Sequence, residues 1–214
     1  NNPQHEYTKS LLAAVPKLGE MASKKYPEPM RLVGEKKTKT LKPIVGTNEP
    51  LLKVNNLVTR YPVKGGVFRR TVARVHAVED VSFTIMKGKT LSLVGESGCG
   101  KSTVGRSLIR LAEATSGDVN LDGQNILALN SKDMREARSN IQMVFQDPFA
   151  SLNPQMMLID QVAEPLRNYG MVKHEILQEK IGDLFDRVKL PRSFMQRYPH
   201  ELSGGQRQRI AIAR

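Results

Sequence analysis

The residues with the clearest capacity for chemistry form the run Gly95-Glu96-Ser97-Gly98-Cys99-Gly100-Lys101-Ser102. A glycine, four residues and then Gly-Lys-Ser is the spacing of a phosphate-binding loop. Its glycines let the backbone curl so that successive N–H groups point inward, toward an anion. We therefore expect a nucleoside triphosphate here, with the ammonium of Lys101 on its β- and γ-phosphates and the hydroxyl of Ser102 on Mg²⁺.

The flanking sequence indicates the elements that must position this loop. Residues 90–95, TLSLVG, are a short apolar run typical of a strand, and residues 103–112 have helical spacing. A helix starting here adds its positive N-terminal end to the phosphate site, so Thr103 joins the expected nucleotide contacts. A chance glycine turn is the weaker interpretation, because the pattern arises by chance in roughly one chain of this length in a hundred.

A second candidate anion site lies about 100 residues downstream, in the stretch LSGGQ. Ser203 and the amides of Gly204 and Gly205, at the start of a helix, can bind a phosphate. An exposed Ser-Gly-Gly helix cap accounts for the two glycines but leaves Gln206 unexplained. The two motifs together predict two anion-binding sites, whereas a phosphate loop alone would predict one.

With LSGGQ following a phosphate loop, the chain resembles the ATP-binding subunits of ABC transporters, whose signature is this pentapeptide. The resemblance implies that two ATP molecules are sandwiched between two such domains. Ser203, Gly204, Gly205 and Gln206 would then act in trans, on the γ-phosphate of the nucleotide held by the opposing domain.

Single positions carry further implications of this resemblance. Gln146, which ends the apolar run IQMVFQ, matches the Q-loop glutamine, which in the family contacts Mg²⁺ and water and senses the permease. A plain surface glutamine is the competing interpretation. Tyr61 matches the aromatic residue that stacks on adenine, and a core tyrosine at a strand end is the competing interpretation. His76 matches family positions near the nucleotide, and we interpret it as structural. We interpret His200, just before the signature, as a positioning residue, not a base. Cys99 occupies a variable position of the loop and is assigned no chemistry of its own.

Three stretches narrow the resemblance to one group of importers. VHAVEDVSF, VFQDPFASLNP and RYPHELSGGQRQRIAIAR are similar to the dipeptide, oligopeptide, nickel and glutathione importers. The opening NNPQHEYTKSLLAAVP resembles the C-terminal end of the same ATPases, with Glu6 where proline is usual. We therefore expect a tandem protein: residues 1–16 end one ATPase domain, 17–50 form a linker, and 51–214 begin a second ATP-binding domain with a helical subdomain at about 155–200.

The resemblance also sets an expectation for the two ends. The sequence starts without an initiator methionine and stops in the helix after the signature, before the Walker B carboxylates and the switch histidine of the family. We expect the full-length protein to be an ATPase coupled to transport. We expect the 214-residue piece not to hydrolyse ATP alone, because no residue fills those two roles.

The expected function is uptake of peptides or of a peptide-like solute such as glutathione. The partners that the resemblance implies are ABC permease subunits, a second ATP-binding domain and, indirectly, a periplasmic or extracellular solute-binding protein. The protein would be peripheral, on the cytoplasmic face of the inner membrane. Apolar residues between Gln146 and the signature suit a permease-docking surface; those that look exposed are Phe149, Leu152, Met156, Met157, Tyr169 and Met171.

Composition limits the rival functions. The net charge is +12, and residues 111–214 carry 13 basic and 13 acidic groups, so the basic excess lies in the first 110 residues. An ABC protein acting on nucleic acid or ribosomes is the rival that this excess favours. The single cysteine cannot build the zinc sites of the repair type, and the absence of tryptophan gives little support to base stacking. We therefore expect no nucleic-acid partner.

The expected fold class is α/β, a P-loop NTPase of the ABC ATPase type, truncated before Walker B. It should have a strand-rich N-terminal part, a parallel-sheet core and a helical subdomain. The alternating or short apolar segments that predict strands are 51–61, 75–85, 90–95, 117–126 and 141–146. Helical spacing is found at 8–15, 103–112, 134–140 and from residue 160 onward.

Overall fold

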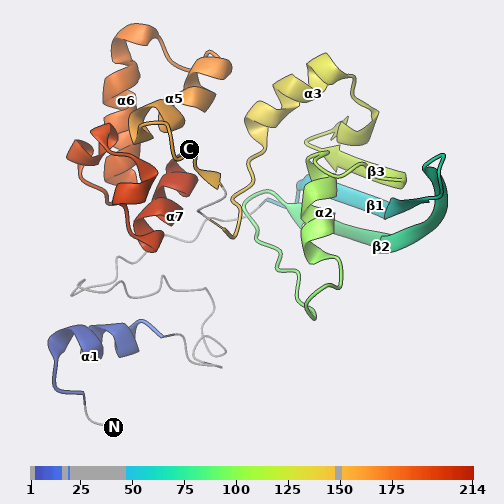
Figure 1. Ribbon diagram of the computed structural model, residues 1–214, viewed down its shortest axis with the longest axis horizontal. Helices are drawn as coiled ribbons and strands as arrows, with labels where there is room; N and C mark the ends of the chain where they lie inside the picture. The colour runs from blue at the N-terminus through green and yellow to red at the C-terminus, as the bar shows by residue number, and fades with distance from the viewer. Residues whose placement is uncertain (1–2, 16–18, 20–46, 148–150) are drawn as a thin grey trace.

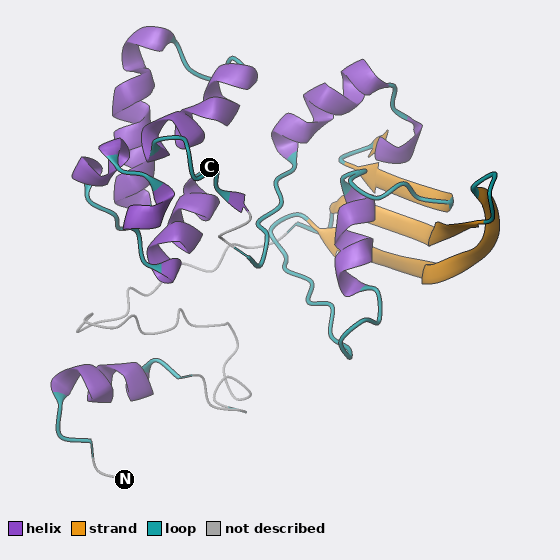
Figure 2. Cartoon of the chain, viewed as in Figure 1, coloured by secondary structure: helices purple, strands orange, loops and turns teal. Residues whose placement is uncertain are grey.

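The computed structural model describes residues 3–15, 19, 47–147 and 151–214. A sheet with short helices and a group of longer helices make up most of these residues (Figures 1 and 2). Almost all of the expected linker lies outside the described residues. Helix α1, Glu6–Ala13, covers the helix expected near the start and has no buried residue.

The sheet has four strands in the order β2-β1-β3-β4. The long strands β1 (Pro50–Gly65) and β2 (Arg70–Met86) form an antiparallel hairpin. Strand β3 (Ser116–Leu121) pairs antiparallel with the other edge of β1, and the two-residue β4 (Gln124–Asn125) pairs with β3. The strand-rich front of the sequence therefore folds as one antiparallel sheet around β1.

One face of this sheet forms the first hydrophobic core. Alternation along the strands turns apolar side chains to one side, where they meet α2 (Lys101–Leu108) and α3 (Ser131–Ala137). Figure 1 shows α2 crossing in front of β1 and β2. The 3₁₀ turns η1 (Ile126–Ala128) and η2 (Arg138–Asn140) flank α3. The buried members are Val54, Leu57, Val78, Val104, Val119, Ile126, Met134 and Ala137.

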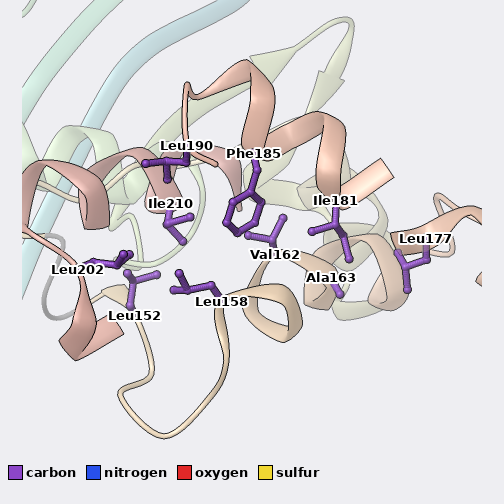
Figure 3. Close-up of a cluster of buried hydrophobic side chains, with 10 residues drawn as sticks. All are labelled: Leu152, Leu158, Val162, Ala163, Leu177, Ile181, Phe185, Leu190, Leu202 and Ile210. Carbon is purple, nitrogen blue, oxygen red and sulfur yellow. The ribbon is translucent and has the colours of Figure 1, made fainter. Parts of the chain in front are cut away.

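The second core lies between the helices α5 (Leu158–Asn168), α6 (His174–Arg187) and α7 (Gly204–Ala213). The 3₁₀ turns η3 (Arg192–Gln196) and η4 (Pro199–Glu201) join α6 to α7. Figure 3 shows the side chain of Phe185, which is fully buried, between those of Val162 and Ile210. The ten buried residues of this cluster are Leu152, Leu158, Val162, Ala163, Leu177, Ile181, Phe185, Leu190, Leu202 and Ile210.

A single arginine fixes the chain that leaves α6. The Arg192 guanidinium donates to Glu179, Asp183 and Asp186, each at 2.9 Å. It lies across Gly182, where an added Cβ would come within 2.8 Å of a guanidinium nitrogen. The hydrogen bonds to Asp186 and Glu179 raise the pKa of Arg192 above its usual range.

Most of the expected elements are confirmed, but two strands are not. Residues 90–95 and 141–146 form no strand and pair with none of the described strands. The side chains of Leu93, Val94 and Val144 are exposed, whereas a sheet core would bury them. The expected parallel-sheet core is therefore wrong for the described residues, whose sheet is antiparallel throughout. An apolar run forms a strand only where a partner satisfies its backbone N–H and C=O groups.

Truncation of Phe185 tests whether the helical core holds the helices together. We expect Phe185→Ala to lower the free energy of unfolding by about 3–5 kcal/mol, because it removes a fully buried ring and leaves a cavity. Urea unfolding with amide exchange measured on α5–α7 checks this. Ile176→Ala, at a position 58% exposed on α6, is the control and should change stability by about 0.5 kcal/mol or less. Equal effects of the two changes would contradict this description of the core.

Candidate nucleotide-binding site

The phosphate loop passes so close to β2 that one of its residues has to be glycine. Gly100 precedes α2 with φ of +93°, in the left-handed region. A Cβ built on Gly100 would collide with the backbone oxygen of Ala77, which no side chain tolerates. The loop backbone is thus held against β2, with the N–H groups of the first turn of α2 facing the loop.

Lys101 curls back over the loop that precedes it. Its ammonium donates to the carbonyl oxygens of Gly95, at 2.8 Å, and Glu96. The Cys99 sulfur lies 3.4 Å from the same nitrogen. These acceptors keep a cation inside the curl of the loop, where an incoming phosphate would offer it stronger, charged acceptors.

The rest of the loop is open to solvent. Gly95, Glu96, Ser97, Gly98, Cys99 and Ser102 are exposed, and Thr103 is half-buried at the start of α2. Gly98 also has a left-handed backbone, with φ of +85°, but a Cβ added there would meet nothing within 4 Å. The sequence prediction of a cradle that leads into a helix is consistent with this geometry, in which the exposed backbone is free to receive an anion.

Gln146 and Ser102 line one cleft of about 1080 Å³. Its walls come from α2, the segment 141–147, α5 and the end of α7. Both side chains are accessible. The two residues expected to contact Mg²⁺ therefore border the same space. No group of three or more His, Cys, Asp or Glu side chains suited to a metal ion is found in the part of the chain that the structure describes.

Tyr61 lies on β1 opposite Val75 and is 40% exposed. Its neighbour Arg60 makes a two-pronged contact with Glu79, through bonds of 2.7 and 2.8 Å. His76 Nδ1 lies 2.7 Å from the same carboxylate. The hydrogen bond from Arg60 lowers the pKa of Glu79, so this carboxylate remains ionised and holds Arg60 beside Tyr61. The tyrosine ring is accessible for stacking, and His76 has the structural contact expected of it.

The signature residues form the start of α7. The Ser203 hydroxyl accepts from the backbone N–H of Gln206 at 3.4 Å, and the Gln206 side chain accepts from the Ser203 N–H at 2.9 Å. This reciprocal pair is a capping box. It gives Gln206 a local role that the sequence analysis missed, although the Ser-x-x-Gln spacing is a known signal for it. Gly204 and Gly205 have open space where a side chain would stand.

Among the described residues, the signature does not share the cleft that Ser102 of the phosphate loop borders. The cleft that contains Ser102 and Gln146 is lined by the C-terminal end of α7, and none of the residues 203–206 borders it. The structure thus brings together two of the predicted site residues and leaves the signature elsewhere.

The expected docking residues fall into two groups. Tyr169 and Met171 are 38% and 51% exposed and line the cleft. Met156 and Met157 are half-buried. Leu152 is 4% exposed and belongs to the helical core, so its expected exposure is wrong, because packing against α5 and α7 covers it. Phe149 lies outside the described residues.

The sequence matches the ABC transporter family over residues 78–214. This range includes the phosphate loop, Gln146 and the signature. The chain therefore belongs to the ABC transporter family, and its fold is that of a P-loop ATPase of the ABC type.

Named relatives agree with this assignment. The chain is 48% identical over 217 residues to the glutathione import ATP-binding protein of Escherichia coli K12 and 44% identical to that of Pectobacterium atrosepticum. Each alignment covers 99% of this chain and 35% of the relative, so the chain spans about a third of the length of these curated relatives.

Solved structures share the fold. A dimeric ATP-binding cassette, MJ0796, bound to ADP and phosphate has a TM-score of 0.65 and 29% identity, covering 76% of this chain and 67% of its own. CbiO1 of Clostridium perfringens, part of an ABC transporter complex, has a TM-score of 0.61 and 25% identity, covering 78% and 61%.

Two glycine substitutions separate close packing from backbone strain in the loop. Gly100→Ala and Gly98→Ala each place an alanine at a positive φ, which costs about 1 kcal/mol. Only Gly100→Ala also drives a methyl group into the Ala77 carbonyl. We expect thermal unfolding to show a loss of stability at least about twofold larger for Gly100→Ala. Equal losses would mean that the loop does not depend on its contact with β2.

Proposed function

We propose that this chain supplies the ATP-binding part of an ABC importer that takes up a peptide-like solute, with glutathione as the first candidate. The observation that carries the proposal is the phosphate loop, held against β2 by Gly100 with the Lys101 ammonium inside its curl. The names of the relatives support the class of solute. The full-length protein would hydrolyse ATP, and the 214-residue piece alone would bind MgATP without hydrolysing it.

The proposed nucleotide contacts follow from the positions of the side chains. The loop from Gly95 to Thr103 would surround the phosphates, and Tyr61 would stack on the adenine. Mg²⁺ would be held between the phosphates, Ser102 and Gln146. The signature residues 203–206 do not border the cleft that holds Ser102, which fits a role on the nucleotide of a second ATP-binding domain.

Removal of the Lys101 ammonium tests the nucleotide site. We expect Lys101→Ala to weaken MgATP binding by roughly 10- to 100-fold, because a hydrogen bond between two charged groups is lost. Titration with a fluorescent ATP analogue measures it. Lys132→Ala, an exposed lysine on α3, is the matched control and should bind like the wild type. Equal affinity of Lys101→Ala and wild type, with both folded, would refute the site.

We further propose that permease subunits dock beside the cleft and hold the protein on the cytoplasmic face of the inner membrane. Gln146 borders the cleft together with Tyr169 and Met171, so a partner seated on these apolar residues would lie beside the segment that shares the cleft with Ser102. Gln146 would thereby couple docking to the nucleotide. A solute-binding protein would join the assembly only through the permeases.

A coupling role for Gln146 predicts a separation of binding from transport. In the full-length protein reconstituted with its permeases, Gln146→Ala should leave ATP affinity within about twofold while uptake of labelled peptide or glutathione falls on the order of tenfold. Gln178→Ala, on the exposed side of α6, is the control. Uptake by the Gln146→Ala variant at the wild-type rate would contradict the coupling role. Absence of ATP-dependent uptake of any of these solutes by the wild type would instead overturn the transport proposal.

A further inference from the structure

The outer half of the β1–β2 hairpin projects from the sheet, and none of the described elements covers it. From Tyr61 to His76 every residue except Gly65 is exposed. The turn carries Val67, which is 94% exposed, and Phe68, which is 84% exposed. Figure 1 shows this turn at the end of the sheet, beyond α2. An isolated two-stranded ribbon is only marginally stable in water, so apolar residues on it suggest a surface that covers them.

The apolar side chains gather on one face of this ribbon. Residues directly opposite in an antiparallel pair share a face, and Tyr61 lies opposite Val75 while Val63 lies opposite Ala73. A Cβ on Gly65 would lie 3.0 Å from the Val72 side chain, so Val72 is on the same side as Val63. Val63, Val72 and Val75 are 41%, 67% and 54% exposed.

The same segment is strongly basic. Between residues 62 and 76 the cations are Lys64, Arg69, Arg70 and Arg74, and there is no acidic residue. None of the four makes an ion pair with any residue that the structure describes. Arg70 lies over the Phe68 ring, with its guanidinium carbon 5.8 Å from the ring centre. An apolar turn ringed by exposed cations is complementary to an anionic surface with an apolar interior.

We propose that this hairpin binds the anionic phospholipids of a membrane surface. Val67 and Phe68 enter the boundary between headgroups and acyl chains, while Lys64, Arg69, Arg70 and Arg74 contact lipid phosphates. Nucleic acid fits the turn less well, because single-strand binding uses several aromatic platforms and the turn has one ring. The contact goes beyond the proposed transport function and adds a weak attachment to that made by permeases.

The absence of tryptophan from the chain makes a direct test possible. Phe68→Trp places the only indole at the turn. Vesicles of phosphatidylcholine with one third phosphatidylglycerol should shift its emission to the blue, and brominated acyl chains should quench it. Vesicles of phosphatidylcholine alone should give no shift. Failure of brominated lipid to quench the indole in vesicles that bind the protein would overturn the proposal.

Two double variants, made without the tryptophan, separate the contribution of the cations to vesicle binding from that of apolar insertion. Each cation near an anionic surface contributes about a fivefold factor in partitioning. Arg69→Gln with Arg70→Gln should therefore weaken vesicle co-sedimentation about 25-fold, and Val67→Ser with Phe68→Ser should weaken it by at least about tenfold. Neither pair belongs to the nucleotide site, so MgATP affinity should be unchanged and a failure here leaves the transport proposal standing.

Two control variants remove residues of the same kinds outside the hairpin. Lys132→Gln with Arg135→Gln removes two exposed cations from α3, and Ile176→Ser removes an exposed apolar residue from α6. Both should bind vesicles like the wild type. If the Lys132→Gln, Arg135→Gln variant lost as much vesicle binding as the Arg69→Gln, Arg70→Gln variant, net charge and not the hairpin would determine binding, and the proposal would be overturned. Tighter binding to DNA or RNA than to anionic vesicles, abolished by the arginine pair, would assign the surface to nucleic acid instead.

Discussion

The contact between Gly100 and the Ala77 carbonyl is the constraint on which the geometry of the site depends. Because the loop backbone touches β2 directly, the start of α2 cannot shift along the sheet. Farther along α2 the buried hydroxyls of Ser107 and Thr59, 2.8 Å apart, join the helix to β1. Two polar or backbone contacts, one at each end, thus orient a helix of only eight residues. Tyr61 sits on β1 just beyond Thr59, so the candidate phosphate and adenine contacts share one rigid frame.

The sequence predicted those features that depend on local pattern. Alternation identified β1 and β2, glycine spacing identified the loop, and helical spacing identified α5 and α6. It failed where the outcome depends on distant residues. The runs at 90–95 and 141–146 have strand composition, but strand formation needs a partner that their own residues cannot reveal. Likewise, the sequence predicted Leu152 in an exposed apolar patch, and only the packing of α5 against α7 explains why it is buried.

The start of α7 shows how one short motif serves structure and leaves donors for a ligand. In the capping box the Ser203 hydroxyl accepts a long hydrogen bond of 3.4 Å from the Gln206 N–H, and the Gln206 side chain accepts a shorter one of 2.9 Å from the Ser203 N–H. A charged phosphate oxygen would compete easily with the longer, weaker bond, whereas the Gln206 bond would continue to hold the helix start. The two glycines add no side chain that would shield their N–H groups. The serine hydroxyl and the glycine amides would therefore be the groups open to a phosphate, while Gln206 holds the start of the helix.

The segment 141–147 joins the two hydrophobic cores, and its lack of a strand partner among the described residues has a physical consequence. Ile141 packs against the sheet-side core, while Val144 and Phe145 are exposed along the cleft. A segment without ladder hydrogen bonds shifts at little cost, whereas each core resists deformation because its side chains are close-packed. A ligand on Ser102 and a partner beside α5 would therefore both act on the segment 141–147. Gln146, one residue before the end of this segment, borders the same cleft as Ser102 and is therefore the residue through which such a partner would act on the ligand.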